Sequence, residues 1–109
     1  MSILELADPV LSEIVSRLVK TFKPDKIYLF GSKARGDFGQ DSDYDILIVV
    51  PDEAEQARRK SRTAYQALRG TRAAADVIVQ TRHEFESRLR ITASLQATVA
   101  REGKLLYAA

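Results

Sequence analysis

Two short apolar runs, separated by a polar segment, constrain the fold of this chain more than any other feature. The first run, at 27–30, leads directly into Gly31-Ser32, and the second, at 46–50, follows directly after Asp43-Tyr44-Asp45. Short apolar runs bounded by glycine and aspartate are typical of strands. The sequence therefore predicts two strands, with a glycine–serine turn at the end of one and two alternate carboxylates at the start of the other.

A helix is predicted to precede the first strand. Asp8 suits the N-cap position, and Pro9 suits the first helical position. The Lys-Pro-Asp sequence at 23–25 ends this helix, so that the first strand covers 26–30. Between these limits apolar residues recur at helical spacing and form one stripe, at Leu11, Ile14, Val15, Leu18, Val19 and Phe22.

Strands and helices also alternate along the rest of the chain. The glycines within 31–42 predict a turn, a short helical piece and a loop. The other predicted elements are strands at 43–50, 74–79 and 104–107, a charged helix at 53–69 that ends at Gly70, and helical content over 82–102 before Gly103. Together they predict an α/β (α+β) fold, a small mixed β-sheet with helices mainly on one face.

The composition indicates one folded domain in a reducing compartment. A length of 109 residues and a hydrophobic content of 45% are ordinary for a single domain. The absence of cysteine excludes disulfides and thiolate zinc sites. No apolar run approaches the roughly 20 residues of a membrane span, and no signal sequence is evident, so we expect a cytoplasmic protein. A net charge of +2 does not by itself indicate nucleic-acid binding.

Asp43 and Asp45 are candidate metal ligands. Alternate residues of a strand point to one face, so both carboxylates would face the same point. The two charges repel, and a divalent cation relieves the repulsion. Oxygen ligands suit Mg²⁺ or Mn²⁺, and two such ions about 3.5–4 Å apart support in-line phosphoryl chemistry. The alternative, two solvent-facing turn residues, is less favoured because aspartate is depleted in strands and the glycine–serine turn precedes this pair.

Asp76 is the third candidate carboxylate. It interrupts the apolar run of the third strand, where a charge is costly unless it is paired or bound to a metal. If the third strand lies beside the second, Asp76 completes a triad, in which it can bind the catalytic metal and help to deprotonate an attacking hydroxyl. The alternatives are a strand-end aspartate that faces water and an ion pair with Arg72 or Arg82. The triad is favoured.

Four residues are candidates for binding the phosphates of a nucleotide. Gly31 allows a close approach of the backbone, and N–H groups exposed in such a turn favour anions. Ser32 adds a hydroxyl donor, or serves only as the N-cap of a plain turn. The guanidinium of Arg35 suits bidentate phosphate contact, with a salt bridge to a nearby aspartate as an equal alternative. Ser42 joins this set, or only caps the loop before the second strand.

Several other polar residues have ordinary structural explanations. His83, with Thr81 as a cap before it, is expected at an exposed helix start rather than as a catalytic base. Strand alternation directs Tyr44 to the face opposite the two aspartates. A basic cluster on and after the middle helix is expected to be a solvated face rather than a contact surface for RNA or a partner: Arg58, Arg59, Lys60, Arg62, Arg69 and Arg72.

Taken together, these residues resemble a known family. Gly31-Ser32, ten further residues and Asp43-x-Asp45, with the sequence GSKARGD at 31–37 and a later strand carboxylate at Asp76, resemble the minimal nucleotidyltransferases of the DNA polymerase beta superfamily. The resemblance covers about residues 9–107, including the closing segment at 101–107. It identifies residues 1–109 as a single minimal nucleotidyltransferase domain, for which the polymerase beta-like fold is expected.

The resemblance implies an activity and its cofactors. In the family pattern, Asp43 and Asp45 hold two Mg²⁺ ions, Asp76 supports the catalytic metal and the acceptor hydroxyl, and Gly31-Ser32 binds the triphosphate. The implied reaction moves a nucleoside monophosphate, AMP from ATP, onto a hydroxyl group and releases pyrophosphate.

The resemblance also implies a partner. Many minimal members look like the antitoxin of a toxin–antitoxin pair whose toxin is a HEPN ribonuclease, and such an antitoxin transfers AMP to a tyrosine of the toxin. Larger relatives carry a further helical domain for the acceptor. We therefore expect a HEPN toxin, or a second copy of this chain, to supply the acceptor site. Two alternatives stay open, a non-catalytic subunit that neutralises a toxin by binding and an adenylyltransferase that modifies a small molecule such as an antibiotic.

Overall fold

The computed structural model describes residues 2–3, 8–36, 43–71 and 74–109. In these residues a five-stranded mixed sheet has the order β1-β5-β2-β3-β4. The strands are β1 (Ser2–Ile3), β2 (Lys26–Phe30), β3 (Tyr44–Val50), β4 (Ala75–Thr81) and β5 (Lys104–Ala108). Strands β3 and β4 are parallel, because the chain crosses over between them, and the remaining pairs are antiparallel. The predicted mixed sheet is confirmed, and the two-residue β1 is an addition that no sequence pattern indicated.

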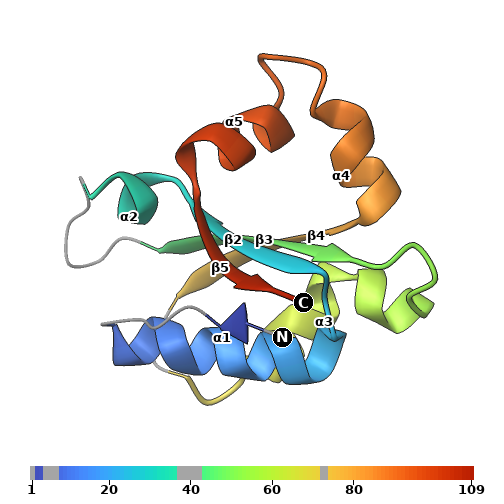
Figure 1. Cartoon of the computed structure of the whole chain (residues 1–109). Helices are drawn as coiled ribbons and strands as arrows, with labels where there is room; N and C mark the ends of the chain where they lie inside the picture. The colour runs from blue at the N-terminus through green and yellow to red at the C-terminus, as the bar shows by residue number, and fades with distance from the viewer. Residues whose placement is uncertain (1, 4–7, 37–42, 72–73) are drawn as a thin grey trace.

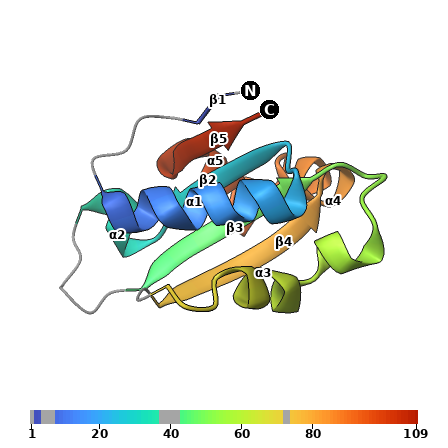
Figure 2. The same ribbon diagram turned by 90° about the horizontal axis from the view of Figure 1, so that it is seen from below.

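Helices cover both faces of this sheet (Figure 1). They are α1 (Pro9–Phe22), α2 (Ser32–Arg35), the 3₁₀ helix η1 (Gln56–Arg59), α3 (Ser61–Ala67), α4 (Arg82–Arg88) and α5 (Leu95–Glu102). Figure 2 shows α1 and α3 in front of the strands and α4 behind them. The short α2 lies at the edge of the sheet where β2 ends and β3 begins (Figure 1).

The helix α1 begins and ends as the sequence predicts. The side chain of Asp8 accepts hydrogen bonds from the N–H groups of Val10 and Leu11, at 3.0 and 3.2 Å, and Pro9 occupies the first turn. Lys23 ends the helix in the left-handed conformation, with a φ of 47°. The predicted apolar stripe is buried against the sheet, except that Val19 is only half-buried.

The two faces of the sheet carry separate core clusters. Tyr44, Ile46, Ile48 and Val50 belong to the larger cluster, which packs under α1 and α3, and Leu47 and Val49 belong to the other, with residues of α4 and α5. A continuous apolar run, rather than an alternating one, is typical of a strand that is buried on both faces. The α/β fold is thus confirmed, while its helices are distributed more evenly over the two faces than predicted.

The predicted helix at 53–69 is wrong, because the chain forms η1 and α3 with a break between them. Lys60 has an extended backbone, with φ −113° and ψ 133°. The guanidinium of Arg59 turns back and donates to the carbonyl oxygens of Ala54 and Asp52, at 2.8 and 3.0 Å, which closes the first segment as a separate turn. The helical content predicted over 82–102 is likewise divided into α4 and α5, and Ser94 caps the second.

No helix in the described part of the chain is long and apolar enough to cross a membrane.

Candidate functional site

The sheet brings the predicted carboxylates to one edge. Because β2 and β3 are antiparallel, the end of β2 lies beside the start of β3, and Phe30 pairs with Asp45. Because β3 and β4 are parallel, both begin at this edge, and Asp45 pairs directly with Asp76. The third strand therefore lies beside the second, which is the condition that the sequence set for Asp76, whereas Asp43 precedes β3 by one residue. The glycine–serine turn follows Phe30 at the same edge.

Asp45 faces the side of the sheet covered by α4 and α5. It alternates along β3 with Tyr44 and Ile46, which belong to the cluster on the α1 side. Asp76 precedes Ile78 by two residues, and Ile78 packs against the cluster on the α4 side. Asp45 is half-buried, whereas Asp43 and Asp76 are exposed. In the described part of the chain, Asp43 and Asp76 are thus accessible to a ligand in solvent.

The electrostatics of the edge favour a cation. Burial raises the pKa of the Asp45 carboxyl, and the nearby charges of Asp76 and Asp43 raise it further, while Arg35 acts in the opposite direction. The charges of Asp43, Asp76 and Arg35 therefore all act on the Asp45 carboxyl. A divalent cation would relieve this repulsion, and an all-oxygen set of ligands fits Mg²⁺ or Mn²⁺.

The residues that could hold such a cation are Asp43, Asp45 and Asp76. Within residues 2–3, 8–36, 43–71 and 74–109, no three His, Cys, Asp or Glu side chains are gathered closely enough to form a ready metal-binding group. The three aspartates share an edge but do not converge on one point. Side-chain rotation would have to complete the ligand set, which is consistent with like charges that repel one another.

Gly31 lies against the Asp45 side chain, and its lack of a Cβ atom allows this contact. Its φ of +75° and ψ of −157° lie in a region that is essentially restricted to glycine. A Cβ atom at this position would also overlap Oδ2 of Asp45 and lie 3.1 Å from its Cγ. The turn and the carboxylate strand thus approach each other as closely as they do only because residue 31 is glycine. Sequence reasoning selected Gly31 for its backbone freedom but did not predict this contact with Asp45.

The helix α2 continues directly from this turn. The N–H groups of Ala34 and Arg35 donate to the Gly31 carbonyl oxygen at 3.1 and 3.2 Å, and Gly36 ends the helix in the left-handed conformation. Ser32 is half-buried at the start of the helix, and Arg35 is exposed at its end. Ser42, the fourth predicted phosphate ligand, lies outside the described residues.

A cavity of about 210 Å³ adjoins the glycine turn. Phe30, Gly31 and Arg35 line it on the sheet side, and Leu95, Thr98 and Glu102 of α5 line it on the other. Sequence reasoning did not connect α5 with the site, because nothing in the pattern at 95–102 indicates which part of the sheet this helix covers. The cavity places a mixed apolar and polar wall next to the proposed phosphate-binding turn.

Tyr44 faces away from the aspartates, as strand alternation predicts. Its hydroxyl donates a 2.6 Å hydrogen bond to Oδ2 of Asp8 on the α1 side of the sheet. Burial, together with this hydrogen bond and the charge of Asp8, raises the pKa of Tyr44 to about 12. The phenol is therefore protonated at neutral pH and acts as a donor.

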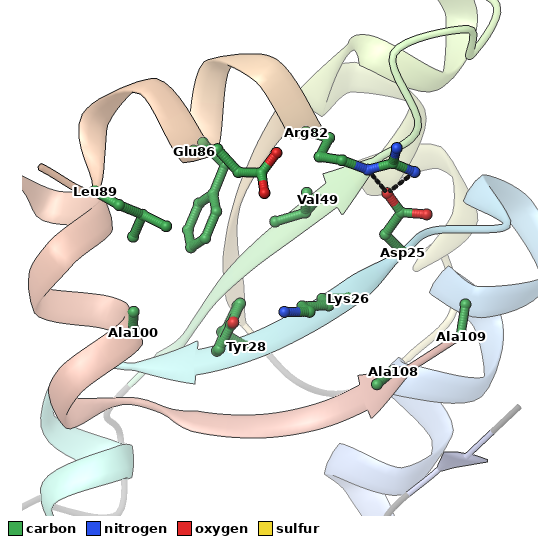
Figure 3. Close-up of a pocket in the computed structure, with 11 residues that line it drawn as sticks. Asp25, Lys26, Tyr28, Val49, Arg82, Glu86, Leu89, Ala100, Ala108 and Ala109 are labelled. Atoms are coloured by element: carbon green, nitrogen blue, oxygen red, sulfur yellow. Dashed lines mark hydrogen bonds and ion pairs between the residues drawn. The ribbon is translucent and has the colours of Figure 1, made fainter.

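A second cavity, of about 510 Å³, lies at the opposite end of the sheet (Figure 3). Arg82 forms an ion pair there with Asp25, at 2.7 Å, so the alternative pairing of Arg82 with Asp76 is wrong. Tyr28 is buried and packs against Phe85, with ring centroids 5.6 Å apart. Of the predicted site residues that the structure describes, none lines this cavity.

His83 is exposed at the start of α4, as predicted. Its backbone N–H donates to Oδ1 of Asp52 at 2.8 Å. Thr81 caps the helix in a capping box with Glu84. Thr81 and His83 therefore belong to the start of α4, at the opposite end of β4 from Asp76.

Comparison with known proteins gives one family. The protein family described as "Nucleotidyltransferase domain" matches residues 10–101, which is most of the chain. A protein of Methanocaldococcus jannaschii, named as a candidate protein adenylyltransferase, is 44% identical over 50 residues. These residues are 46% of this chain and 48% of the relative, so the match spans about half the length of that protein.

Solved structures share the fold over nearly the whole chain. A candidate nucleotidyltransferase from Sulfolobus solfataricus is similar with a TM-score of 0.60 and 27% identity, over 91% of this chain and 78% of that one. A toxin–antitoxin structure with AMP-PNP has a TM-score of 0.61 and 23% identity, over 90% and 73%. A mutant of the toxin–antitoxin MntA-HpeT has a TM-score of 0.59 and 20% identity, over 90% and 72%.

Proposed function

Because this chain belongs to the nucleotidyltransferase domain family, we propose that it transfers a nucleoside monophosphate from a nucleoside triphosphate to a hydroxyl group of a partner protein. The observation that carries the proposal is the register of the sheet. It sets Asp45 directly beside Asp76, with Gly31 against the Asp45 carboxylate. The glycine–serine turn, which is the proposed phosphate ligand, and the carboxylates of Asp45 and Asp76 therefore lie at one edge of the sheet.

The site residues divide between the metals and the triphosphate. Asp43, Asp45 and Asp76 would hold two Mg²⁺ ions, which supply Lewis-acid stabilisation of the charge that develops on the phosphate oxygens. The backbone at Gly31, the hydroxyls of Ser32 and Ser42 and the guanidinium of Arg35 would bind the triphosphate.

The proposed transfer is a single displacement at phosphorus. The acceptor oxygen forms a bond to the α-phosphorus, the bond from that phosphorus to the bridging oxygen breaks, and pyrophosphate leaves. Asp76, which is exposed and pairs with Asp45, would accept the proton of the acceptor hydroxyl. Gly31 keeps the turn close to Asp45, so that the phosphates and the carboxylates are held in one arrangement.

The proposed acceptor is a tyrosine hydroxyl of a HEPN-type toxin, and the proposed donor is ATP, so that the chain acts as an antitoxin. The names of similar proteins support a toxin as the partner and an adenine nucleotide as the donor, since two structures of similar fold are toxin–antitoxin structures, one of them with AMP-PNP. The M. jannaschii relative, named as a candidate protein adenylyltransferase, supports a protein as the acceptor. A second copy of this chain is the other acceptor that the proposal allows.

Intact-mass spectrometry of the complex tests the proposal. The chain is purified with its co-expressed partner and incubated with Mg²⁺ and each of the four nucleoside triphosphates. We expect the partner to gain the mass of one AMP group with ATP, and Asp43→Ala and Asp45→Ala to abolish the gain. Glu86→Ala, an exposed carboxylate variant on α4, is the matched control and should retain it. The proposal would be contradicted if none of the four nucleotides gave an adduct.

Neutralisation of the toxin in cells separates catalysis from simple binding. Catalytic neutralisation predicts that the double variant Asp43→Ala/Asp45→Ala still forms the complex but no longer protects cells. Protection by that variant would instead identify the chain as a neutralising subunit that acts by binding.

A further inference from the structure

Tyr44 is the residue between the two aspartates, and its side chain connects three elements. The ring is buried in the core cluster on the α1 side of the sheet. The hydroxyl donates to Asp8, and the same carboxylate caps the first turn of α1 through its other oxygen. Tyr44 is therefore fixed at both ends, by the backbone of β3 and by the N-terminus of α1.

The ring of Tyr44 also contacts the helix that carries the proposed phosphate ligands. Nζ of Lys33 lies over this ring, 4.3 Å from its centroid, which is a cation–π arrangement. Lys33 follows Ser32 and precedes Ala34, and Ala34 packs against the same core cluster. One face of α2 thus rests on the reverse side of the strand segment that bears the carboxylates.

The helix α2 needs such a support. It has four residues, too few for a stable helix in isolation, and it ends at Gly36. Its position relative to Asp45 must therefore come from tertiary contacts, and the contact of Lys33 with the Tyr44 ring is one that involves the carboxylate strand itself. A shift of α2 would move Ser32 and Arg35 relative to the aspartates.

We propose that Tyr44 is a positioning residue, which holds Lys33 and hence α2 so that the triphosphate ligands are in register with the carboxylates. This inference rests on the proposed function, because it assigns Tyr44 to the binding of the same nucleotide. The side chain acts from the far side of the strand and contacts neither the phosphates nor the metals. Its effect is on the affinity for the nucleotide rather than on the chemical step.

Four variants test the inference, together with a control. Tyr44→Leu removes the ring and the hydroxyl, and Tyr44→Phe keeps the ring that Lys33 contacts. Lys33→Met removes the cation, and Lys33→Arg restores one. Ile48→Ala is the matched control, since Ile48 is buried on the same face of the same strand but belongs to its other half. The readouts are KM and kcat for ATP, the affinity for a fluorescent ATP analogue with Mg²⁺, and hydrogen–deuterium exchange of the segment 31–36.

We expect Tyr44→Leu and Lys33→Met to raise KM and the dissociation constant of the analogue about three- to thirty-fold, the range that corresponds to the loss of a cation–π contact, with a smaller change in kcat. Exchange of the segment 31–36 should become faster in both. Tyr44→Phe should change KM and the exchange of 31–36 less than Tyr44→Leu does. Lys33→Arg should change them less than Lys33→Met does. Ile48→Ala should lower the melting temperature and leave KM within about two-fold.

Three results would overturn the inference. The first is unchanged KM and unchanged exchange of 31–36 in a folded Tyr44→Leu variant. The second is an increase of KM in Ile48→Ala equal to that in Tyr44→Leu, because the effect would then follow stability alone. If Tyr44→Leu does not fold, Lys33→Met decides in its place, since Lys33 is outside the core. The third result is a failure of the unsubstituted chain to bind any nucleotide. That result would overturn the proposed function as well, whereas the first two results leave the proposed function intact.

Discussion

At the scale of single residues, the contact between Gly31 and Asp45 decides whether the site can form. The backbone of Gly31 has a conformation that other residues rarely adopt, and the space where a side chain would begin is occupied by the Asp45 carboxylate. The backbone conformation therefore favours glycine at this position, and a Cβ atom would in addition displace the Asp45 carboxylate from its present place. Gly70 has only the first of these two features, since it has a φ of +90° but nothing within 4 Å of the place of a Cβ atom.

Gly31→Ala should slow transfer strongly, whereas Gly70→Ala should not. Alanine at 31 must move either the turn or the carboxylate, and a displacement of about 1 Å can cost on the order of 100-fold in rate. The strained backbone adds about 1–3 kcal/mol of destabilisation. Alanine at 70 should cost about 1–2 kcal/mol from its left-handed backbone and leave transfer intact. Rates of adduct formation and urea denaturation of both variants give the comparison, and equal activity of the two variants would contradict it.

Asp45 should lower the stability of the metal-free protein at neutral pH. Its pKa is raised in the folded state, so the folded chain binds more protons than the unfolded chain, and this contribution to stability falls as pH rises from the ordinary pKa of 3.8 through the raised one. Asp45→Asn should therefore raise the melting temperature in EDTA at pH 7, and the advantage should vanish near pH 3. An Asn variant that is less stable than the unsubstituted chain at pH 7 would count against this electrostatic account.

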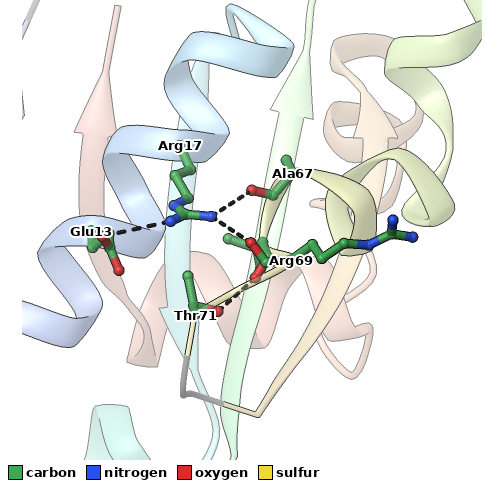
Figure 4. Close-up of polar contacts among 6 residues, drawn as sticks. Glu13, Arg17, Ala67, Arg69 and Thr71 are labelled. Atoms are coloured by element: carbon green, nitrogen blue, oxygen red, sulfur yellow. Dashed lines mark hydrogen bonds and ion pairs between the residues drawn. The ribbon is translucent and has the colours of Figure 1, made fainter.

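At the scale of elements, α1 and α3 are joined by a side chain that caps the end of a helix (Figure 4). The guanidinium of Arg17 donates to the carbonyl oxygens of Ala67 and Arg69, at 3.4 and 2.7 Å, at the C-terminal end of α3. These carbonyl oxygens have no partner within the helix, and a cation there also interacts favourably with the helix dipole. The accompanying ion pair with Glu13, at 3.7 Å, is largely exposed and contributes little.

Arg17→Met should destabilise the fold by about 1.5–3 kcal/mol, the usual range for hydrogen bonds to a charged group. Methionine keeps an apolar stem, so the loss reports the guanidinium rather than the packing. Glu13→Gln, at the exposed end of the same network, should change the free energy of unfolding by less than about 1 kcal/mol. Urea denaturation measures both variants, and a larger loss from Glu13→Gln would show that the ion pair, not the cap, joins these helices.

At the scale of the whole molecule, the fold gathers the site from segments that are far apart in the chain. The end of β2, the start of β3 and the start of β4 meet because one strand pair is antiparallel and the next is parallel. The α5 helix then adds a wall to the same edge from the C-terminal part of the chain. A ligand bound here would contact segments from residue 30 to residue 102 and should therefore stabilise the fold as a unit.

Mg²⁺ with a non-hydrolysable ATP analogue should raise the melting temperature. A ligand present at 100 times its dissociation constant stabilises the folded state by about 2.7 kcal/mol. Neither component alone should reproduce the shift, because the carboxylates and the triphosphate share the cation. Asp43→Ala should eliminate the shift, and Glu86→Ala should keep it. Differential scanning fluorimetry with and without EDTA provides the measurement, and an equal shift in Asp43→Ala would exclude Asp43 from the metal site.

Sequence reasoning located most strands and the candidate site because both depend on local patterns. The strand at 26–30, the Asp8 cap and the opposite orientation of Tyr44 follow from periodicity and capping, which act over a few residues. The helix expected at 53–69 failed because Arg59 returns to the carbonyls of Ala54 and Asp52, a contact that helical propensity does not register. The short β1 was missed because two residues carry no periodicity, and its pairing with β5 is a contact across nearly the whole chain.

The sequence by itself determined which residues are available for chemistry: a glycine–serine turn, two alternate aspartates after a strand boundary and a third aspartate in a later strand. It could do so because turn residues and strand alternation are local properties of the backbone. Only the tertiary structure decided that Asp76 pairs with Asp45, that Gly31 contacts the Asp45 carboxylate and that α5 borders the site. The strand register and the positions of the helices depend on packing between distant segments. They are fixed because the apolar run at 46–50 must be buried on both faces of the sheet.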